Sequence, residues 1–331
     1  MNTEFEPTAD RVVIIGGGPG GEDAALVAAQ LGADVMLIER NRCGGAAVLT
    51  DVVPSKSLSA PAEMMEEIAR SESLGIRIYD SEGDDGDTVI ADLKAVNKRI
   101  LSLADAQAND IYQALVRAGV KVIQGTATLA DRDHVAVVEE GGTEYTLEAS
   151  TILLSVGSHP RELDSAKPDA ERILTWTQLY DLDELPEHLI VVGSGVTGAE
   201  FASAYRALGT KVTLVSSREK VLPGQDEDAA DVLEYVFRNK GMNVLSRSRA
   251  DSVKRTDNGV EVTLSDGRRV EGSHCLMAVG SIPNTEDLGL SAAKVKVSES
   301  GHIKVDGVSR TSRSGVYAAG ACTGVLPLVS V

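Results

Sequence analysis

Three glycines and one acid near the start of the chain have the types and spacing that bind a dinucleotide. Gly16 permits a tight strand-to-helix turn, Gly18 lets the backbone approach a phosphate without a Cβ, and Gly21 lets a helix pack closely on a strand. Glu39 follows Gly21 by 18 residues, where a carboxylate accepts both ribose hydroxyls of an adenosine. These four residues predict the binding of a pyrophosphate and its adenosine.

These residues need a strand, a turn, a helix and a second, parallel strand to position them. The sequence supplies an apolar run at 12–15, the glycine cluster at 16–21, an alanine-rich helical pattern through Leu31 and a second apolar run that ends at Glu39. This order is that of a βαβ unit, which directs backbone amides and a helix N-terminus at a pyrophosphate. A glycine pattern alone also fits a purely structural βαβ unit, but the terminal acid favours dinucleotide binding.

A second copy of this unit lies 177 residues further along the chain, with no gap between the matching positions. Gly193, Gly195 and Gly198 repeat the three glycines, and Ser216 stands at the position of Glu39. A shorter echo pairs VGSHP at 156–160 with VGSIP at 279–283. We therefore expect an α/β fold with two Rossmann-like dinucleotide-binding domains, and two bound nucleotides.

Composition limits the functions that the chain can have. A length of 331 residues favours two domains, and 43% hydrophobic residues suffice for packed cores. No apolar run approaches the roughly 18 residues of a membrane span, and the acidic segment 1–10 shows no signal or transit pattern, so we expect a cytoplasmic protein. The formal charge of −18 disfavours nucleic acid and anionic lipid as partners. Cysteines and histidines show no metal-ligand spacing, so no metal is expected.

The remaining segments are predicted to be scaffold. Helical apolar spacing covers 62–74, 88–118 and 229–240, and the acidic stretch 80–87 predicts a solvent loop. Short alternating segments over 120–152 predict a small antiparallel sheet. Further strands are expected at 253, 260–264 and 269–270, separated by glycine turns.

The segment GGAAVLTDVVPSK, from Gly44 to Lys56, resembles the flavoprotein disulfide reductase family, which includes dihydrolipoamide dehydrogenase and glutathione reductase. In that family a glycine pair precedes two redox cysteines, and Pro-Ser-Lys follows them. Here the cysteine positions hold Ala47 and Val52, so disulfide exchange, which needs a thiolate at each turn of the cycle, is excluded. The segment is most similar to the cysteine-deficient branch of the family, the actinobacterial NAD(P)H:quinone reductases related to dihydrolipoamide dehydrogenase.

The resemblance implies FAD in the first glycine-lined site and a nicotinamide dinucleotide in the second. The family's flavin site also includes Gly45, Gly320 and an aspartate that holds a ribityl hydroxyl; Ala321 stands at that last position here. Loss of this charged hydrogen bond predicts weaker FAD binding. Gly157 and Gly280 are expected beside the cofactors, where the chain leaves and re-enters the flavin domain.

The second site differs from the first at the position that reads the cofactor. Ser216, Ser217 and Arg218 offer hydroxyl donors and a guanidinium in place of an acid, so NADPH is favoured over NADH, with use of both left open. The alternative for Arg218 is an ordinary surface cation at the end of a strand.

Lys56 and Glu200 are the catalytic residues that the resemblance implies. In the family, the lysine of Pro-Ser-Lys pairs with this glutamate beside the flavin N5, where an ammonium stabilises the negative charge that develops on reduction. A surface lysine and a glutamate that interacts with the helix dipole are the alternatives.

The resemblance further implies a discontinuous FAD-binding domain, residues 1–158 and 283–331, around an NAD(P)H-binding domain at 159–282. We expect hydride transfer from NAD(P)H to FAD, followed by reduction of a small quinone-like acceptor. The alternatives are a soluble pyridine nucleotide transhydrogenase and a non-catalytic or incomplete nucleotide-binding chain. The chain is expected to lack the family's C-terminal dimerisation domain, which forms a homodimer in full-length relatives.

Overall fold

The computed structural model describes residues 11–76 and 89–325, and the chain divides into two compact units. The first unit comprises Met1–Val53, Ser102–His159 and Ser281–Val331, and the second comprises Pro54–Leu101 and Pro160–Gly280. The expected solvent loop at 80–87 and the N-terminal segment 1–10 lie outside the described residues. The expected α/β class with two Rossmann-like units is confirmed.

Residues 54–101 belong to the second unit, whereas we expected them in the flavin domain. The reason is apolar packing, since Leu58 and Ile100 join the core that contains Phe201 and Tyr205. The other divisions, after His159 and after Gly280, fall within two residues of the expected ones. Which nucleotide each unit binds stays a prediction.

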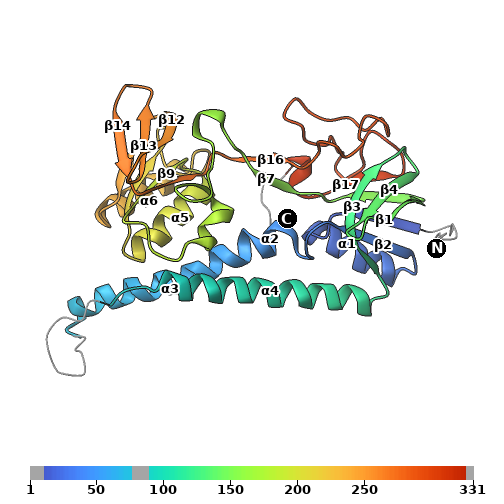
Figure 1. Cartoon of the computed structure of the whole chain (residues 1–331), viewed down its shortest axis with the longest axis horizontal. Helices are drawn as coiled ribbons and strands as arrows, with labels where there is room; N and C mark the ends of the chain where they lie inside the picture. The colour runs from blue at the N-terminus through green and yellow to red at the C-terminus, as the bar shows by residue number, and fades with distance from the viewer. Residues whose placement is uncertain (1–10, 77–88, 326–331) are drawn as a thin grey trace. The chain divides into compact units, whose positions relative to one another are not determined.

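The first unit is built on a seven-stranded sheet in the order β17-β6-β1-β2-β3-β4-β5 (Figure 1). Its strands are β1 (Arg11–Ile15), β2 (Asp34–Glu39), β3 (Lys121–Leu129), β4 (His134–Glu139), β5 (Glu144–Glu148), β6 (Thr151–Leu154) and β17 (Val316–Ala318). Strands β17 to β3 run parallel, and β4 and β5 continue the sheet in antiparallel direction. The predicted antiparallel segment is thus an extension of the parallel sheet.

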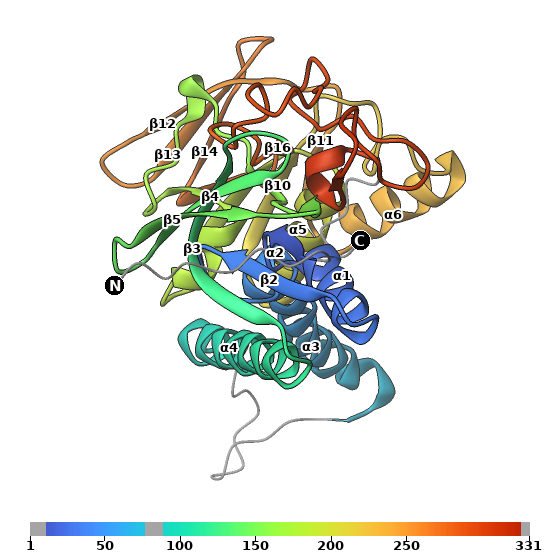
Figure 2. The same cartoon turned by 90° about the vertical axis from the view of Figure 1, so that its right-hand side faces the viewer.

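Side chains of β1 alternate between the two faces of this sheet. Ile14 packs with Ala25 of α1 (Pro19–Gln30) and Leu115 of α4 (Leu93–Arg117), whereas Val13 and Ile15 enter a second core shared with β4 and β5. Figure 2 shows α1 beside β2, the strand that it precedes in the chain. Two short helical segments follow β2 in sequence, α2 (Gly45–Leu49) and the start of α3 (Val52–Ser71).

The second unit contains a five-stranded parallel sheet in the order β11-β10-β9-β15-β8. These strands are β8 (Ile173–Thr175), β9 (His188–Val192), β10 (Lys211–Val215), β11 (Asn243–Leu245) and β15 (His274–Met277). Helices α5 (Val196–Ala207) and α6 (Glu227–Asn239) cover one face, because Leu189 and Val191 pack with Phe201 and Phe237.

An antiparallel sheet covers the other face of the second unit. It consists of β12 (Ala250–Arg255), β13 (Val260–Leu264) and β14 (Arg269–Gly272), and Ile190 and Val192 of β9 pack against Val253 and Val262. Strands β7 (Ser158–Pro160) and β16 (Ser281–Pro283) pair where the chain passes between the units. The remaining described elements are the 3₁₀ turns η1 (Glu72–Leu74), η2 (Asp164–Ala166), η3 (Trp176–Asp181) and η4 (Ala321–Thr323).

The expected helices and strands are found with shifted ends. The helix predicted at 62–74 begins earlier, at Val52, and the helix predicted at 88–118 is α4, from Leu93 to Arg117. The helix predicted at 229–240 is α6. None of the helices in the described ranges is long and apolar enough to span a bilayer.

Candidate dinucleotide sites and a lysine–glutamate pair

The first glycine turn joins β1 to α1 and leaves no room for side chains at two positions. Gly16 has a φ of +102°, and a Cβ there would lie less than 3.0 Å from the Ser155 carbonyl oxygen. A Cβ on Gly21 would lie less than 3.0 Å from the Gly16 carbonyl oxygen. These close approaches bring the start of α1 directly against the end of β1, as a Rossmann-like turn requires.

The N-terminus of α1 has the features of an anion site. Gly18 is the N-cap residue, and no side chain among the described residues caps this helix end. Pro19 occupies the first helical turn, where a missing N–H costs no intrahelical hydrogen bond. Gly45, with a φ of +56°, approaches so closely that a Cβ there would lie 2.8 Å from the Gly18 Cα. The free amides and the helix dipole suit a pyrophosphate.

Glu39 is fixed at the same turn by the backbone. It is the last residue of β2 and is 9% exposed. Its Oε2 accepts the Gly17 N–H over 2.7 Å, and its Oε1 accepts the Asn41 N–H over 2.8 Å. Each carboxylate oxygen keeps further acceptor capacity, so the geometry allows Glu39 to accept ribose hydroxyls as well.

Three further predicted residues gather at this edge of the sheet. Gly157 follows β6 and Gly320 follows β17, with φ values of +65° and +81°. Because β1, β6 and β17 run parallel, their carboxyl ends share one edge, and a Cβ on Gly20 would lie 3.6 Å from the Ala319 Cβ. Ala321 begins the turn η4 there and brings a methyl group, not a hydrogen-bonding side chain.

The second glycine turn, between β9 and α5, reproduces the first. Gly193 has a φ of +115° and faces the Ala278 carbonyl oxygen, and a Cβ on Gly198 would lie less than 3.0 Å from the Gly193 carbonyl oxygen. Gly195 is an N-cap with a φ of −70°, and again no described side chain caps the helix. Gly280, with a φ of +95°, follows β15 at the same edge. The sequence repeat is therefore a repeat of backbone geometry.

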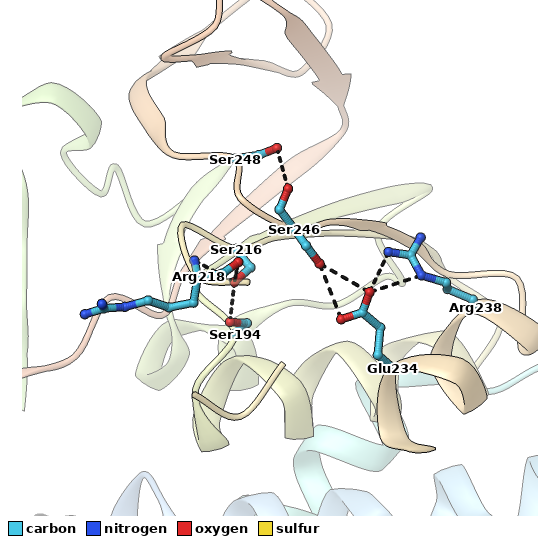
Figure 3. Close-up of polar contacts among 7 residues, drawn as sticks. All are labelled: Ser194, Ser216, Arg218, Glu234, Arg238, Ser246 and Ser248. Atoms are coloured by element: carbon cyan, nitrogen blue, oxygen red, sulfur yellow. Dashed lines mark hydrogen bonds and ion pairs between the residues drawn. The ribbon is translucent and has the colours of Figure 1, made fainter. Parts of the chain in front are cut away.

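Ser216 does not present a free hydroxyl at the end of β10. Its side chain is fully buried, its Oγ lies 2.7 Å from Ser194 Oγ, and it accepts the Arg218 N–H over 3.1 Å (Figure 3). Ser217 and Arg218 are exposed, and the Arg218 side chain extends away from the serine pair. We expected Ser216 to offer a hydroxyl to the cofactor, but that hydroxyl shapes the loop instead.

The loop after β11 joins this site, although no residue pattern near it predicts this. Arg247 donates its backbone N–H to the Arg218 carbonyl oxygen over 2.9 Å, and Ser248 donates to the Ser216 carbonyl oxygen over 2.7 Å. The link depends on β10 and β11 being parallel neighbours, which only the strand order reveals.

Lys56 and Glu200 form an ion pair in the second unit. Lys56 lies in the first turns of α3, and Glu200 is the fifth residue of α5. Ser55, which is buried, donates its hydroxyl to Glu200 Oε1 over 3.2 Å and was not among the predicted site residues. The Lys56 side chain is 62% exposed, so pairing and not burial holds it.

The cysteines offer no redox pair in the described structure. Cys43, Cys275 and Cys322 are each free and buried. Burial raises the pKa of Cys43 to about 11, with the Glu39 and Glu22 charges adding to the effect. A thiol with such a pKa carries almost no thiolate at neutral pH. No group of His, Cys, Asp and Glu with metal-binding geometry occurs within residues 11–76 and 89–325.

A cavity of about 440 Å³ lies at the opposite edge of the second unit's sheet. His188, Lys211 and Asn243, which line it, are the first residues of β9, β10 and β11. Dinucleotides bind at the carboxyl ends of parallel strands. This cavity is therefore not the nucleotide crevice.

The chain is similar in sequence to a known protein family and to several named proteins. A family model described as pyridine nucleotide-disulphide oxidoreductase matches residues 10–331. A Mycobacterium tuberculosis protein named NAD(P)H dehydrogenase (quinone) is 48% identical over 330 residues, which cover 97% of this chain and 66% of the relative. A dihydrolipoyl dehydrogenase of Zymomonas mobilis is 32% identical over 95% of this chain and 66% of the relative.

The crystal structure of LpdA from Mycobacterium tuberculosis has a similar fold. It superposes with a TM-score of 0.90 at 47% identity and covers 97% of this chain and 70% of that one. The chain spans 66% of the length of the curated relatives that it matches.

Proposed function

The chain belongs to the pyridine nucleotide-disulphide oxidoreductase family, and we propose that it uses NAD(P)H and FAD to reduce a small quinone-like acceptor without a redox disulfide. Support comes from one observation above all, the pair of matched glycine turns, each followed by a helix N-terminus that no side chain of the described residues caps. Two such turns suit two dinucleotides, and a single-nucleotide protein needs only one.

The residues of the first unit fit FAD. A Cβ at Gly16, Gly21 or Gly45 would clash with backbone, so the turn is built to let chain segments approach one another closely. Glu39 is held by backbone amides where an adenosine ribose is read. Bound FAD supplies a hydride acceptor and a route for electrons to a second substrate. Gly157, Gly320 and Ala321 are proposed to complete this site.

The residues of the second unit fit a nicotinamide dinucleotide. Gly193, Gly195 and Gly198 would hold its pyrophosphate by the same backbone geometry. We favour NADPH over NADH because Ser217 and Arg218 are exposed at the end of β10 in place of an acid. The name of the M. tuberculosis relative contains NAD(P)H, which is compatible with the use of either NADH or NADPH.

Lys56 is proposed as the residue that stabilises negative charge on the reduced flavin. Glu200 and Ser55 hold its ammonium, and a fixed cation lowers the energy of a developing anion more than a mobile one does. The positions of the family's redox cysteines hold Ala47 and Val52, so no dithiol at these positions can relay electrons from the flavin to an acceptor. That favours acceptors such as quinones, and the M. tuberculosis relative carries quinone in its name.

Spectroscopy of the purified full chain tests the proposal. After reconstitution with FAD, flavin absorbance should bleach on anaerobic addition of NADPH and return when a soluble quinone is added. Protein that stays colourless would support a non-catalytic nucleotide-binding chain. Hydride exchange between NADPH and an NAD analogue, faster than quinone reduction, would instead support a transhydrogenase.

A further inference from the structure

Two arginines converge beside Ser216, and each comes from a different loop of the second unit. Arg218 follows β10, and Arg247 follows β11, the parallel neighbour of β10. Backbone hydrogen bonds of 2.9 Å from Arg247 to Arg218 and of 2.7 Å from Ser248 to Ser216 tie the loops together. In a Rossmann-like unit the adenosine ribose is read at the end of the second strand, which here is β10. The backbones of both arginines therefore lie at the end of β10, where the ribose is read.

The backbone around Arg247 is held firmly on both sides. Ser246 donates to both carboxylate oxygens of Glu234 on α6, over 3.2 and 3.3 Å, and Arg238 binds the same carboxylate over 2.6 Å (Figure 3). Ser248 donates its hydroxyl to the Ser246 carbonyl oxygen over 3.1 Å. Between them Arg247 has a φ of +53°, a conformation that non-glycine residues keep only where the surroundings impose it.

An internal acid already binds the Arg247 guanidinium. Glu219, the residue after Arg218, forms an ion pair with Arg247, and the two side chains are 65% and 72% exposed. Exposed ion pairs of this kind are weak and readily exchanged. The Arg218 guanidinium has no ion-pair partner within residues 11–76 and 89–325. The site therefore holds one unpaired cation and one cation held by a weak competitor.

We propose that Arg247 is a second specificity residue for the 2′-phosphate of NADPH, and that Glu219 is the anion that this phosphate displaces. The inference rests on the proposed binding of a nicotinamide dinucleotide in this unit. A phosphate carries more charge than a carboxylate and offers three acceptor oxygens, so it outcompetes Glu219 for the guanidinium. The 2′-hydroxyl of NADH carries no charge and leaves the pair intact.

Binding titrations on the full chain test this assignment. NADPH, NADH, adenosine 2′,5′-bisphosphate and AMP are the probes, and the last two isolate the phosphate from the nicotinamide. Arg247→Gln should weaken NADPH and adenosine 2′,5′-bisphosphate by about tenfold, the loss expected for one charged hydrogen-bonding group, with NADH and AMP changed less than about twofold. Glu219→Gln should tighten NADPH about threefold, since it removes a competitor of surface-pair strength.

Matched variants separate this site from general charge effects. Arg269→Gln and Glu171→Gln remove the same charges from other exposed ion pairs of the unit and should leave all four affinities unchanged. Arg247→Gly also removes the guanidinium, and glycine accepts the left-handed backbone conformation at this position. If Arg247→Gln folds poorly, Arg247→Gly takes its place in the titrations, with the same expected changes in affinity.

The outcomes distinguish this inference from the proposed function. Equal weakening of NADPH and NADH by Arg247→Gln, or no weakening of either, would overturn the role of Arg247 and leave the proposed function standing. A Glu219→Gln variant that binds NADPH no more tightly would refute the competitor role. Natively folded wild-type protein that binds none of the four probes would overturn both.

Discussion

Gly195 and Gly198 of the second glycine turn should respond in different ways to an added methyl group, one by weaker binding and the other by lower stability. A Cβ on Gly198 would lie far inside the 3.4 Å at which ordinary contact with the Gly193 carbonyl oxygen begins, so α5 must move away from β9. A Cβ on Gly195 meets no heavy atom within 4 Å. Gly198→Ala is therefore a folding defect, and Gly195→Ala is a binding defect.

The magnitudes follow from these contacts. Overpacking costs about 1 to 3 kcal/mol, and the better helix propensity of alanine returns up to about 1 kcal/mol, so Gly198→Ala should destabilise the chain by roughly 1 to 2 kcal/mol. That corresponds to a fall of about 3 to 6 °C in Tm. Gly195→Ala replaces a glycine N-cap by the less favourable alanine, which costs about 0.5 to 1 kcal/mol, and should lower Tm by about 1 to 3 °C. Its methyl group would keep a phosphate from the helix amides and weaken NADPH by roughly tenfold to a hundredfold.

Circular dichroism melts and NADPH titrations of both variants give the assay. Gly307→Ala, at a glycine with open space around it, controls for the exchange itself. A Gly195→Ala variant that lowers Tm as much as Gly198→Ala does, or that binds NADPH as tightly as the wild type, would refute these assignments.

Three further predictions concern the flavin site, the ion pair and pH. Ala321→Asp should lower the Kd for FAD by about tenfold or more, because it adds a charged acceptor worth about 1.5 to 3 kcal/mol; equal FAD titrations for variant and wild type would contradict this. Glu200→Gln should lower kcat for quinone reduction at least about tenfold with FAD content unchanged, because Lys56 loses its ionic partner; full activity would remove the pair from the mechanism. Burial, with the Arg172 charge adding to it, lowers the pKa of His274 to about 4, so only the unfolded chain binds this proton between about pH 6.5 and about pH 4. Between pH 7 and pH 5 the free energy of unfolding should fall by up to about 2 kcal/mol, and by less in His274→Asn, as judged by urea unfolding at the two pH values. Equal pH dependence of the two proteins would disprove the assignment.

The backbone geometry of both glycine turns could be predicted from the sequence, because a tight turn depends on steric limits within a few residues. Gly16 and Gly193 adopt φ values of +102° and +115°, which other residues rarely accept, and each helix start is separated from its strand by the same spacing. The absence of the family's redox cysteine pair could likewise be predicted from the sequence, since Ala47 and Val52 have no thiol in any fold.

The prediction for Ser216 shows where local patterns stop. Its place after the second strand was found by counting from Glu39, but the direction of its hydroxyl was not. Ser194 and the turn to Arg218 compete for that hydroxyl, and burial makes their hydrogen bonds decisive. Residues 54–101 show the same limit, because the unit that they join depends on which core buries their apolar side chains.

The sequence by itself determined the backbone devices of two dinucleotide sites and the loss of the disulfide relay, because sterics and side-chain chemistry act within a few residues. Only the tertiary structure decided which distant groups meet. Lys56 reaches Glu200 across 144 positions, and Arg247 reaches Glu219 across 28. Those meetings depend on the order of parallel strands and on the cores that fix the helices, and no short stretch of sequence encodes either.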